Sequence, residues 1–111
     1  MTESKIEIAK KVLINLMGAG PQDRILVVTD TEKLRIGKIF FEAAVTIGGD
    51  PIMTVIRMRD NDGEEPPLSI ANLMKESDVV LIPTARSLTH TQARIAATQA
   101  SRIMRILISG A

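Results

Sequence analysis

Apolar positions follow two different spacings along this chain, and the two spacings alternate from the first residues to the last. In four segments an apolar residue returns at every third or fourth position, with polar residues between, which predicts amphipathic helices. These segments are Ser4–Met17, Leu34–Ile47, Leu68–Glu76 and Thr89–Ser101. Glycine and proline follow the first two segments, at Gly18–Pro21 and Gly48–Pro51, and both residue types favour the end of a helix.

Between the helical segments lie short runs that are apolar at almost every position and rich in valine and isoleucine. That pattern is typical of strands buried on both faces of a sheet. The predicted strands are Arg24–Thr29, Ile52–Met58, Asp78–Ile82 and Ile103–Ile108. The polar segment Arg59–Pro67 is predicted to be a loop, because it contains Asn61-Asp62-Gly63 and two prolines.

The alternation predicts an α/β domain with a four-stranded parallel sheet. Right-handed crossovers place helices on both faces, so we predict a three-layer sandwich with the flavodoxin-like or Rossmann-like strand order 2-1-3-4. The predicted core residues are Ile25, Val27, Val79, Leu81, Ile106 and Ile108. Because the last predicted strand has no helix after it, we expect the chain to be a truncated piece of a larger protein.

Composition narrows the class of protein. The 111 residues suffice for a single domain, residues 1–111, and 45% hydrophobic with 24% charged residues is a globular composition. Basic and acidic residues number 14 and 13, so the basic excess of a phosphate-binding surface is missing and no nucleic-acid partner is predicted. Without cysteine, a signal peptide or a bilayer-spanning apolar run, the sequence predicts a cytoplasmic protein with no membrane partner.

Side chains suited to catalysis or metal binding are few. His90 is the single histidine, and the one acidic cluster, Asp60, Asp62, Glu64 and Glu65, lacks the frame of about 12 residues and the bidentate glutamate of a calcium loop. We therefore predict a solvated loop here, and no catalytic residue, metal or cofactor site within this chain.

Nucleotide-binding and phosphoacceptor patterns are also missing. No Gly-x-Gly-x-x-Gly or Gly-x-x-x-x-Gly-Lys-Ser/Thr occurs, and the turn Thr29–Glu32 carries two acids that would repel phosphate. Asp30 and Thr31 are suited instead to cap the second helix. A receiver domain would need an aspartate after the third strand, where this chain has Pro83-Thr84.

The segment Thr84–Thr91 joins the carboxyl end of the third strand to the fourth helix, where α/β sheets tend to bind ligands. Four of its residues are candidates for contact with an anion or a neighbouring domain: Arg86, Ser87, Thr89 and His90. The alternative is that they only cap and seat the helix, with Thr89 and Gln92 forming a capping box. A Ser87–His90 nucleophile lacks an orienting carboxylate.

Four stretches carry a resemblance to a known family: Arg24-Ile-Leu-Val-Val-Thr-Asp30, Gly63-Glu-Glu-Pro-Pro67, Asp78-Val-Val-Leu-Ile-Pro-Thr84 and Ser87-Leu-Thr-His-Thr91. In order and spacing the chain resembles the N-terminal domain of the thermophilic-type leucyl metalloaminopeptidases, the aminopeptidase T family. The resemblance implies that a divalent metal pair of the zinc, cobalt or manganese class is held by a separate C-terminal catalytic domain. It also implies a peptide substrate for the whole enzyme, and an N-terminal domain that shapes the entrance and supports a homodimer.

Three functions remain open at this point. The first is the non-catalytic N-terminal domain of a metal-dependent aminopeptidase, a hydrolase when whole. The second is a stand-alone flavodoxin-like module that binds a small anion or a protein partner. The third is an independent small enzyme, for which the residues offer little. The absence of a complete site in the sequence favours the first two.

Overall fold

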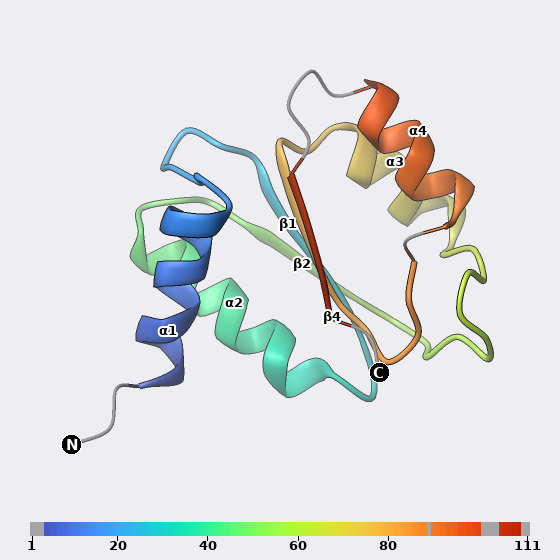
Figure 1. The fold of residues 1–111 in the computed structure, drawn as a ribbon, viewed down its shortest axis with the longest axis horizontal. Coiled ribbons are helices and arrows are strands. Elements are labelled where there is room, and N and C mark those ends of the chain that lie inside the picture. Colours follow the sequence, from blue (N-terminus) through green and yellow to red (C-terminus); the bar gives the residue numbers. More distant parts are fainter. Residues whose placement is uncertain (1–3, 89, 101–104, 110–111) are drawn as a thin grey trace.

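The computed structural model describes residues 4–88, 90–100 and 105–109, with side chains up to residue 98 apart from residue 89. Helices and strands alternate as predicted (Figure 1). The α-helices are α1 (Lys5–Lys11), α2 (Leu34–Thr46), α3 (Leu68–Lys75) and α4 (Gln92–Ala100). The strands are β1 (Ile25–Asp30), β2 (Ile52–Ile56), β3 (Val79–Pro83) and β4 (Arg105–Ser109).

All the strands run parallel, in the order β2-β1-β3-β4. In this register Leu26 of β1 pairs with Ile52 of β2, and Ile25 pairs with Val79 of β3. The predicted α/β class and the order of the first three strands are confirmed, and the backbone of β4 lies beside β3. No helix within the described residues is long and apolar enough to cross a membrane.

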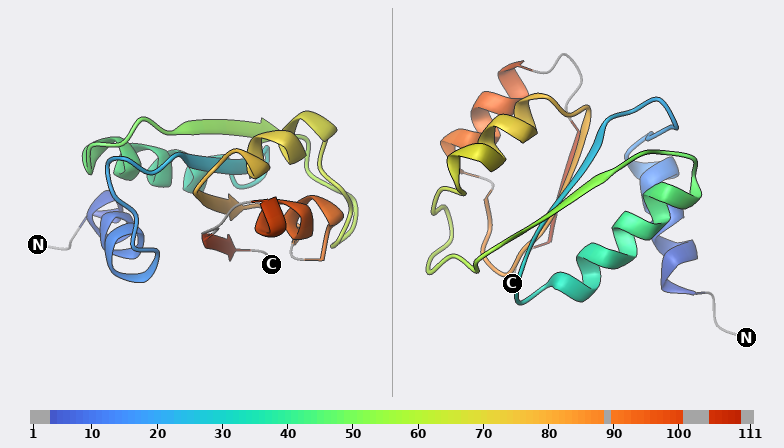
Figure 2. Two further views of the ribbon diagram at one scale, coloured as in Figure 1. Left: turned by 90° about the horizontal axis from the view of Figure 1, so that it is seen from above. Right: turned by 180° about the vertical axis from the view of Figure 1, so that it is seen from behind.

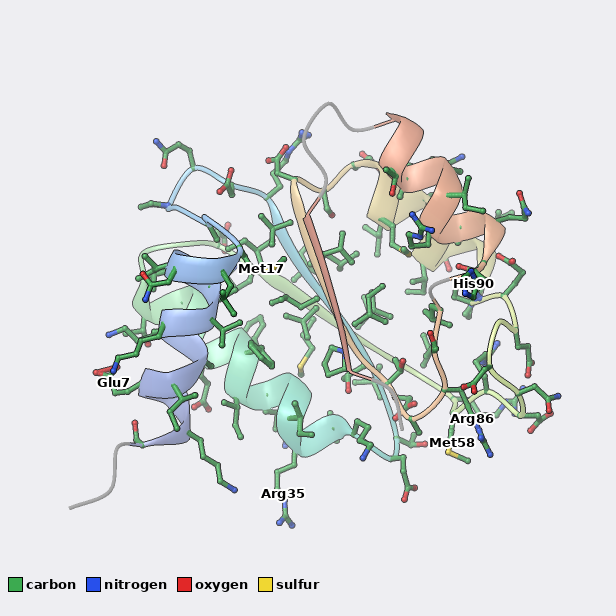
Figure 3. All side chains as sticks on the ribbon, in the orientation of Figure 1. Glu7, Met17, Arg35, Met58, Arg86 and His90 are labelled. Atoms are coloured by element: carbon green, nitrogen blue, oxygen red, sulfur yellow. The ribbon has the colours of Figure 1, made fainter. Side chains whose placement is uncertain are left out.

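The first helix differs from its prediction. Ser4 caps α1 by accepting a hydrogen bond from the Glu7 amide, but α1 ends at Lys11 and a π-helical turn, η1 (Val12–Leu16), follows. The buried residues Ala9, Leu13 and Met17 are spaced by four, so their face drifts around a 3.6-residue helix, and the wider turn corrects the drift. Met17 therefore points towards the sheet, whereas Glu7 points away (Figure 3).

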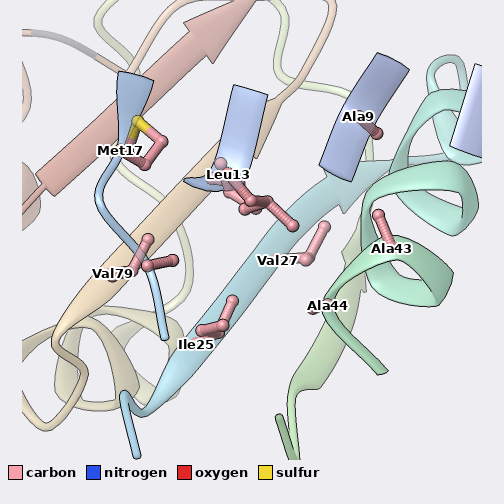
Figure 4. Close-up of a cluster of buried hydrophobic side chains, with 10 residues drawn as sticks. Ala9, Leu13, Met17, Ile25, Val27, Ala43, Ala44 and Val79 are labelled. Carbon is pink, nitrogen blue, oxygen red and sulfur yellow. The ribbon is translucent and has the colours of Figure 1, made fainter. Parts of the chain in front are cut away.

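Two separate clusters of apolar side chains form the core, one on each face of the sheet. Figure 2 shows the arrangement of the helices around the sheet from two further directions. Alternate residues of β1 and β3 point to opposite faces. Ile25, Val27, Val79 and Leu81 pack with α1 and α2, as Figure 4 shows for most of that cluster. All four of these residues were predicted to belong to the core, and all four are buried. The other two predicted core residues, Ile106 and Ile108, have side chains that the structure does not describe. The second cluster contains the intervening residues Leu26, Val28, Val80 and Ile82 with α3 and α4.

Helix α2 packs unusually close to β1. A Cβ atom built on Gly37 would lie 2.7 Å from Cγ2 of Thr29, so only glycine fits at this crossing. The Thr29 hydroxyl in turn donates to the Pro83 carbonyl oxygen at 2.8 Å. This contact holds together the carboxyl ends of β1 and β3, beyond the last paired residues, Val27 and Leu81.

Candidate functional site

The carboxyl ends of β1 and β3 are the place where this topology can open a crevice, because the chain leaves β1 and β3 towards opposite edges of the sheet. In this protein the crevice is closed by side chains of its own. The hydroxyl of Thr29 bridges to Pro83, and Thr84, which is 2% exposed, donates to the Arg86 carbonyl oxygen at 2.7 Å. Neither hydroxyl points into open space for a ligand.

Asp30 completes this closure. The residue is 1% exposed, and its Oδ1 accepts hydrogen bonds from the amides of Glu32 (3.0 Å) and Lys33 (2.8 Å). Its Oδ2 accepts a third from the Ala85 amide at 2.7 Å. The prediction that Asp30 or Thr31 caps the second helix is wrong, because α2 begins at Leu34 and its N-cap residue, Lys33, makes no side-chain cap bond. Asp30 instead binds amides of the turn before α2, and it joins the β1–α2 and β3–α4 connections. Sequence reasoning missed the second contact, whose only signal is an acidic residue at the end of an otherwise apolar strand.

The loop between β2 and α3 supplies further carboxylates, and they also bind backbone amides. Glu64 Oε1 accepts from the amides of Asp60 (2.8 Å) and Asn61 (3.4 Å), and these bonds, the Asp60 one first, hold the pKa of Glu64 below its usual value. Asp62 Oδ1 accepts from the Ser87 amide at 2.9 Å, and the Gly63 amide donates back to the Ser87 carbonyl at 2.8 Å. The acidic loop is therefore an ordered strap across the loop 84–91.

Glu65 ends this strap at the N-terminus of α4. Its carboxylate accepts hydrogen bonds from the amides of Gln92 at 2.6 Å and Ala93 at 3.1 Å. Thr91 Oγ1 accepts from the Arg94 amide at 3.1 Å and acts as the local cap. The amides predicted to attract an external anion are thus bonded to a carboxylate of the same chain.

The start of α4 corrects the predicted capping box. We expected the helix to begin near Thr89, but it begins at Gln92, and the capping hydroxyl is that of Thr91. The Thr91 cap is a local contact, and Glu65, 27 residues away, binds the Gln92 amide in addition. Thr89 itself lies outside the described residues.

The other predicted site residues lie along the same loop without converging. Arg86 and His90 are exposed, and within the described chain neither side chain has a hydrogen-bond or ion-pair partner. Figure 3 shows Arg86 beyond the carboxyl end of β3 and His90 farther along, near the start of α4. Ser87 is half-buried and uses its backbone to bind the acidic strap.

The described residues do not fit the metal pair that the family resemblance implies for a whole enzyme. Among them, no group of three or more histidine, cysteine, aspartate or glutamate side chains could hold a metal ion. The carboxylates at this edge instead bind backbone amides, which act as donors where a metal would need free oxygens.

At the opposite edge of the sheet, an ion pair joins the starts of β1 and β3. Arg24 donates from Nε and Nη2 to the two carboxylate oxygens of Asp78, each at 3.1 Å, and the bond to Asp78 raises the pKa of Arg24. A pocket of about 370 Å³ lies beside this pair. Its walls include Asp23, Arg24, Asp50, Ile52, Leu73 and Glu76.

Neither a protein-family model nor a curated protein sequence matches this chain. Among solved structures, it is similar to 2,5-dihydroxypyridine dioxygenase from Pseudomonas putida KT2440, with a TM-score of 0.76 and 14% identity over 97% of this chain. It is also similar to wild-type AmpT from Thermus thermophilus, with a TM-score of 0.58 and 12% identity over 96% of this chain. The match covers 35% of each of those chains, so this chain spans about a third of their length and shares the fold of that part.

Proposed function

We propose that this chain is a non-catalytic domain of a leucyl-type metal-dependent aminopeptidase, in which a separate domain holds the metal pair and cleaves the peptide. The closed crevice at the carboxyl ends of β1 and β3 carries the proposal. A parallel sheet that binds substrate keeps this position open. Here Thr29, Asp30 and Thr84 fill it, which suits a domain that packs against a catalytic partner.

The two similar structures support this division of labour. Their names, a dioxygenase and AmpT, point to different proteins that share one fold over about a third of each chain. A fold found in two such settings is more readily a common supporting domain than the source of either reaction. The aminopeptidase assignment rests on the sequence stretches Arg24–Asp30, Gly63–Pro67, Asp78–Thr84 and Ser87–Thr91 together with the likeness to AmpT.

Arg86 and His90 are the residues we assign to the contact with the catalytic domain. Both are exposed and unpartnered in the described chain, and both project from a loop that the acidic strap holds in place. Binding of a free small anion at the α4 N-terminus is less well supported, because Glu65 already accepts its first amides. We place the whole enzyme in the cytoplasm, in agreement with the absence of cysteine.

The test has two parts. The purified chain, supplied with zinc, cobalt or manganese, is assayed on leucyl-anilide and leucyl-peptide substrates, and we expect no turnover. The reading frame is then followed at both ends of the chain for a region of roughly 200 residues, about one further domain, that carries histidine and acidic clusters. Metal-dependent hydrolysis that copurifies with the chain, or a frame with no such region, would contradict the proposal.

Within the whole enzyme, Arg86→Ala and His90→Ala should lower activity or loosen the catalytic domain while leaving the stability of this domain almost unchanged. The matched control is Arg35→Ala, since Arg35 is exposed on α2, on the other face of the sheet. If all three substitutions changed activity equally, loop 84–91 would not be part of the interface with the catalytic domain.

A further inference from the structure

Strand β2 forms one edge of the sheet, and no described strand pairs with its outer side. Two of its aliphatic side chains are exposed, Ile52 by 52% and Val55 by 47%. The strand Ile52–Ile56 contains no charge and no proline, the features that usually guard an edge against pairing. An unguarded edge of this kind is a template for another strand.

We propose that β2 pairs antiparallel with β2 of a second copy of this chain, which joins the two sheets across a two-fold axis at Thr54. In this register Ile52 lies opposite the partner's Ile56, and Met53 lies opposite the partner's Val55. Side chains directly opposite each other in an antiparallel pair share a face, so both pairs bring apolar groups together. This proposal does not depend on the proposed function.

Burial within one copy complements this register. Ile56 is 5% exposed and belongs to the cluster beneath α3 and α4, and Met53 packs against the cluster beneath α1 and α2. Each exposed aliphatic residue of one copy, Ile52 or Val55, therefore gains a well-packed neighbour from the other. Two such pairs, each made twice by symmetry, extend both apolar clusters across the axis.

Charge at the two ends of β2 determines the direction. Asp50 precedes the strand and has no hydrogen-bond or ion-pair partner within the described chain, whereas Arg57 and Arg59 follow the strand. Antiparallel pairing places Asp50 beside the partner's Arg57 and Met58. Asp50 also lines the 370 Å³ pocket together with Asp23, Glu76 and Arg24. Because Arg24 is already paired with Asp78, the partner's basic segment meets a surface with an acidic excess. Parallel pairing would align like charges.

A second copy is the partner that this strand fits, because both halves of the interface are present on it. The two exposed aliphatic residues and the better-buried residues they would meet belong to one strand, and the acidic and basic residues flank that same strand. A foreign strand would need to supply the complementary pattern independently.

The experiment measures the dimer dissociation constant of the full chain by sedimentation equilibrium, from low to high micromolar concentration. The test variant carries Ile52→Lys and Val55→Lys. The control carries Ile8→Lys and Val45→Lys, the same residue types on α1 and α2, each 50% exposed. We expect the test variant to weaken the dimer by about tenfold or more, and the control to leave it unchanged.

Charge reversal provides a second measurement that does not disturb the apolar residues. Asp50→Arg and Arg57→Asp should each weaken the dimer, and the two together should restore it. If circular dichroism shows that the variant with Ile52→Lys and Val55→Lys does not fold, the charge-reversal variants alone test the proposal. A wild-type chain that stays monomeric at high micromolar concentration overturns the proposal. So does a dimer that the test and control variants weaken equally, or one whose charge reversals show no mutual rescue.

Discussion

Strands β1 and β2 are neighbours in the sheet and similar in sequence, yet they have opposite environments. Every residue of β1 is buried, including Thr29 and Asp30, whereas β2 has one buried residue, Ile56. Val27 and Val55 face the same side of the sheet, but their exposures are 0% and 47%. The difference comes from position, because β1 has a strand on each side and helices above and below, while β2 has one neighbouring strand within the part of the chain that the structure describes.

The ends of the two strands repeat the contrast. The carboxylate of Asp30, at the end of β1, accepts three backbone hydrogen bonds, and that of Asp50, just before β2, accepts none within the described chain. A polar residue whose groups are all bonded internally supports the architecture. Exposed residues such as Ile52, Val55 and Asp50 instead leave the edge of β2 accessible to another molecule.

The largest expected effect contrasts the two valines. Val27→Asp places a charge among fully buried aliphatic groups and should cost at least about 4 kcal/mol, enough to unfold a domain of this size. Val55→Asp should cost about 1 kcal/mol, because the side chain reaches solvent. Urea unfolding, at a protein concentration too low for the chains to associate, measures the free energy of unfolding of both variants. Similar losses for the two variants would show that β2 is not an edge strand.

The two aspartates provide the next comparison. Asp30→Ala leaves the amides of Glu32, Lys33 and Ala85 without their acceptor and should lower the free energy of unfolding by about 2–4 kcal/mol. Asp50→Ala should change it by less than about 0.5 kcal/mol. Hydrogen exchange should locate the loss for Asp30→Ala at the Ala85 amide. Retained protection there would contradict the bridging role.

A smaller effect is expected where the loop after β2 caps the helix after β3. Glu65→Ala removes the acceptor of the Gln92 and Ala93 amides and should destabilise the domain by about 1 kcal/mol. Glu32→Ala is the control, since Glu32 is an exposed glutamate with no side-chain partner in the described chain. Thermal unfolding of both variants would separate a cap from a solvated side chain; equal melting temperatures would refute the cap.

The smallest effect concerns the pH dependence of the same loop. The pKa of Glu64 lies below its ordinary value of 4.5, mainly because the Asp60 amide donates to its carboxylate. The ionised Glu64 carboxylate therefore stabilises the folded chain fully above the pKa that Glu64 has in the unfolded chain. This stabilisation is lost as the pH falls through the lower pKa of Glu64 in the folded chain. An NMR titration should place the Glu64 midpoint below 4.5. Glu64→Gln should flatten the acid dependence of stability over this range, and an unchanged slope would assign that dependence elsewhere.

Local periodicity by itself determined which segments of this protein form helices and strands, and the order in which they follow along the chain. The apolar spacing in residues 4–17 and the β-branched run in 25–30 act between near neighbours, so their outcome can be read from short segments. The cap at Ser4 and the helix end at Gly18, whose φ is 63°, are equally local. The alternation of these elements was enough to predict a parallel sheet with β1 between β2 and β3.

Tertiary structure alone decided how the polar residues are used. The bond from Ala85 to Asp30 joins residues 55 positions apart, and the one from Gln92 to Glu65 joins residues 27 apart. Such contacts depend on sheet order and loop path, which no local spacing encodes, so the closed crevice and the binding of the first α4 amides by Glu65 could not be predicted. The exposure of β2 is also decided by the tertiary structure. Ile52–Ile56 has the apolar sequence of a buried strand, and only its place at the edge of the sheet leaves Ile52 and Val55 uncovered.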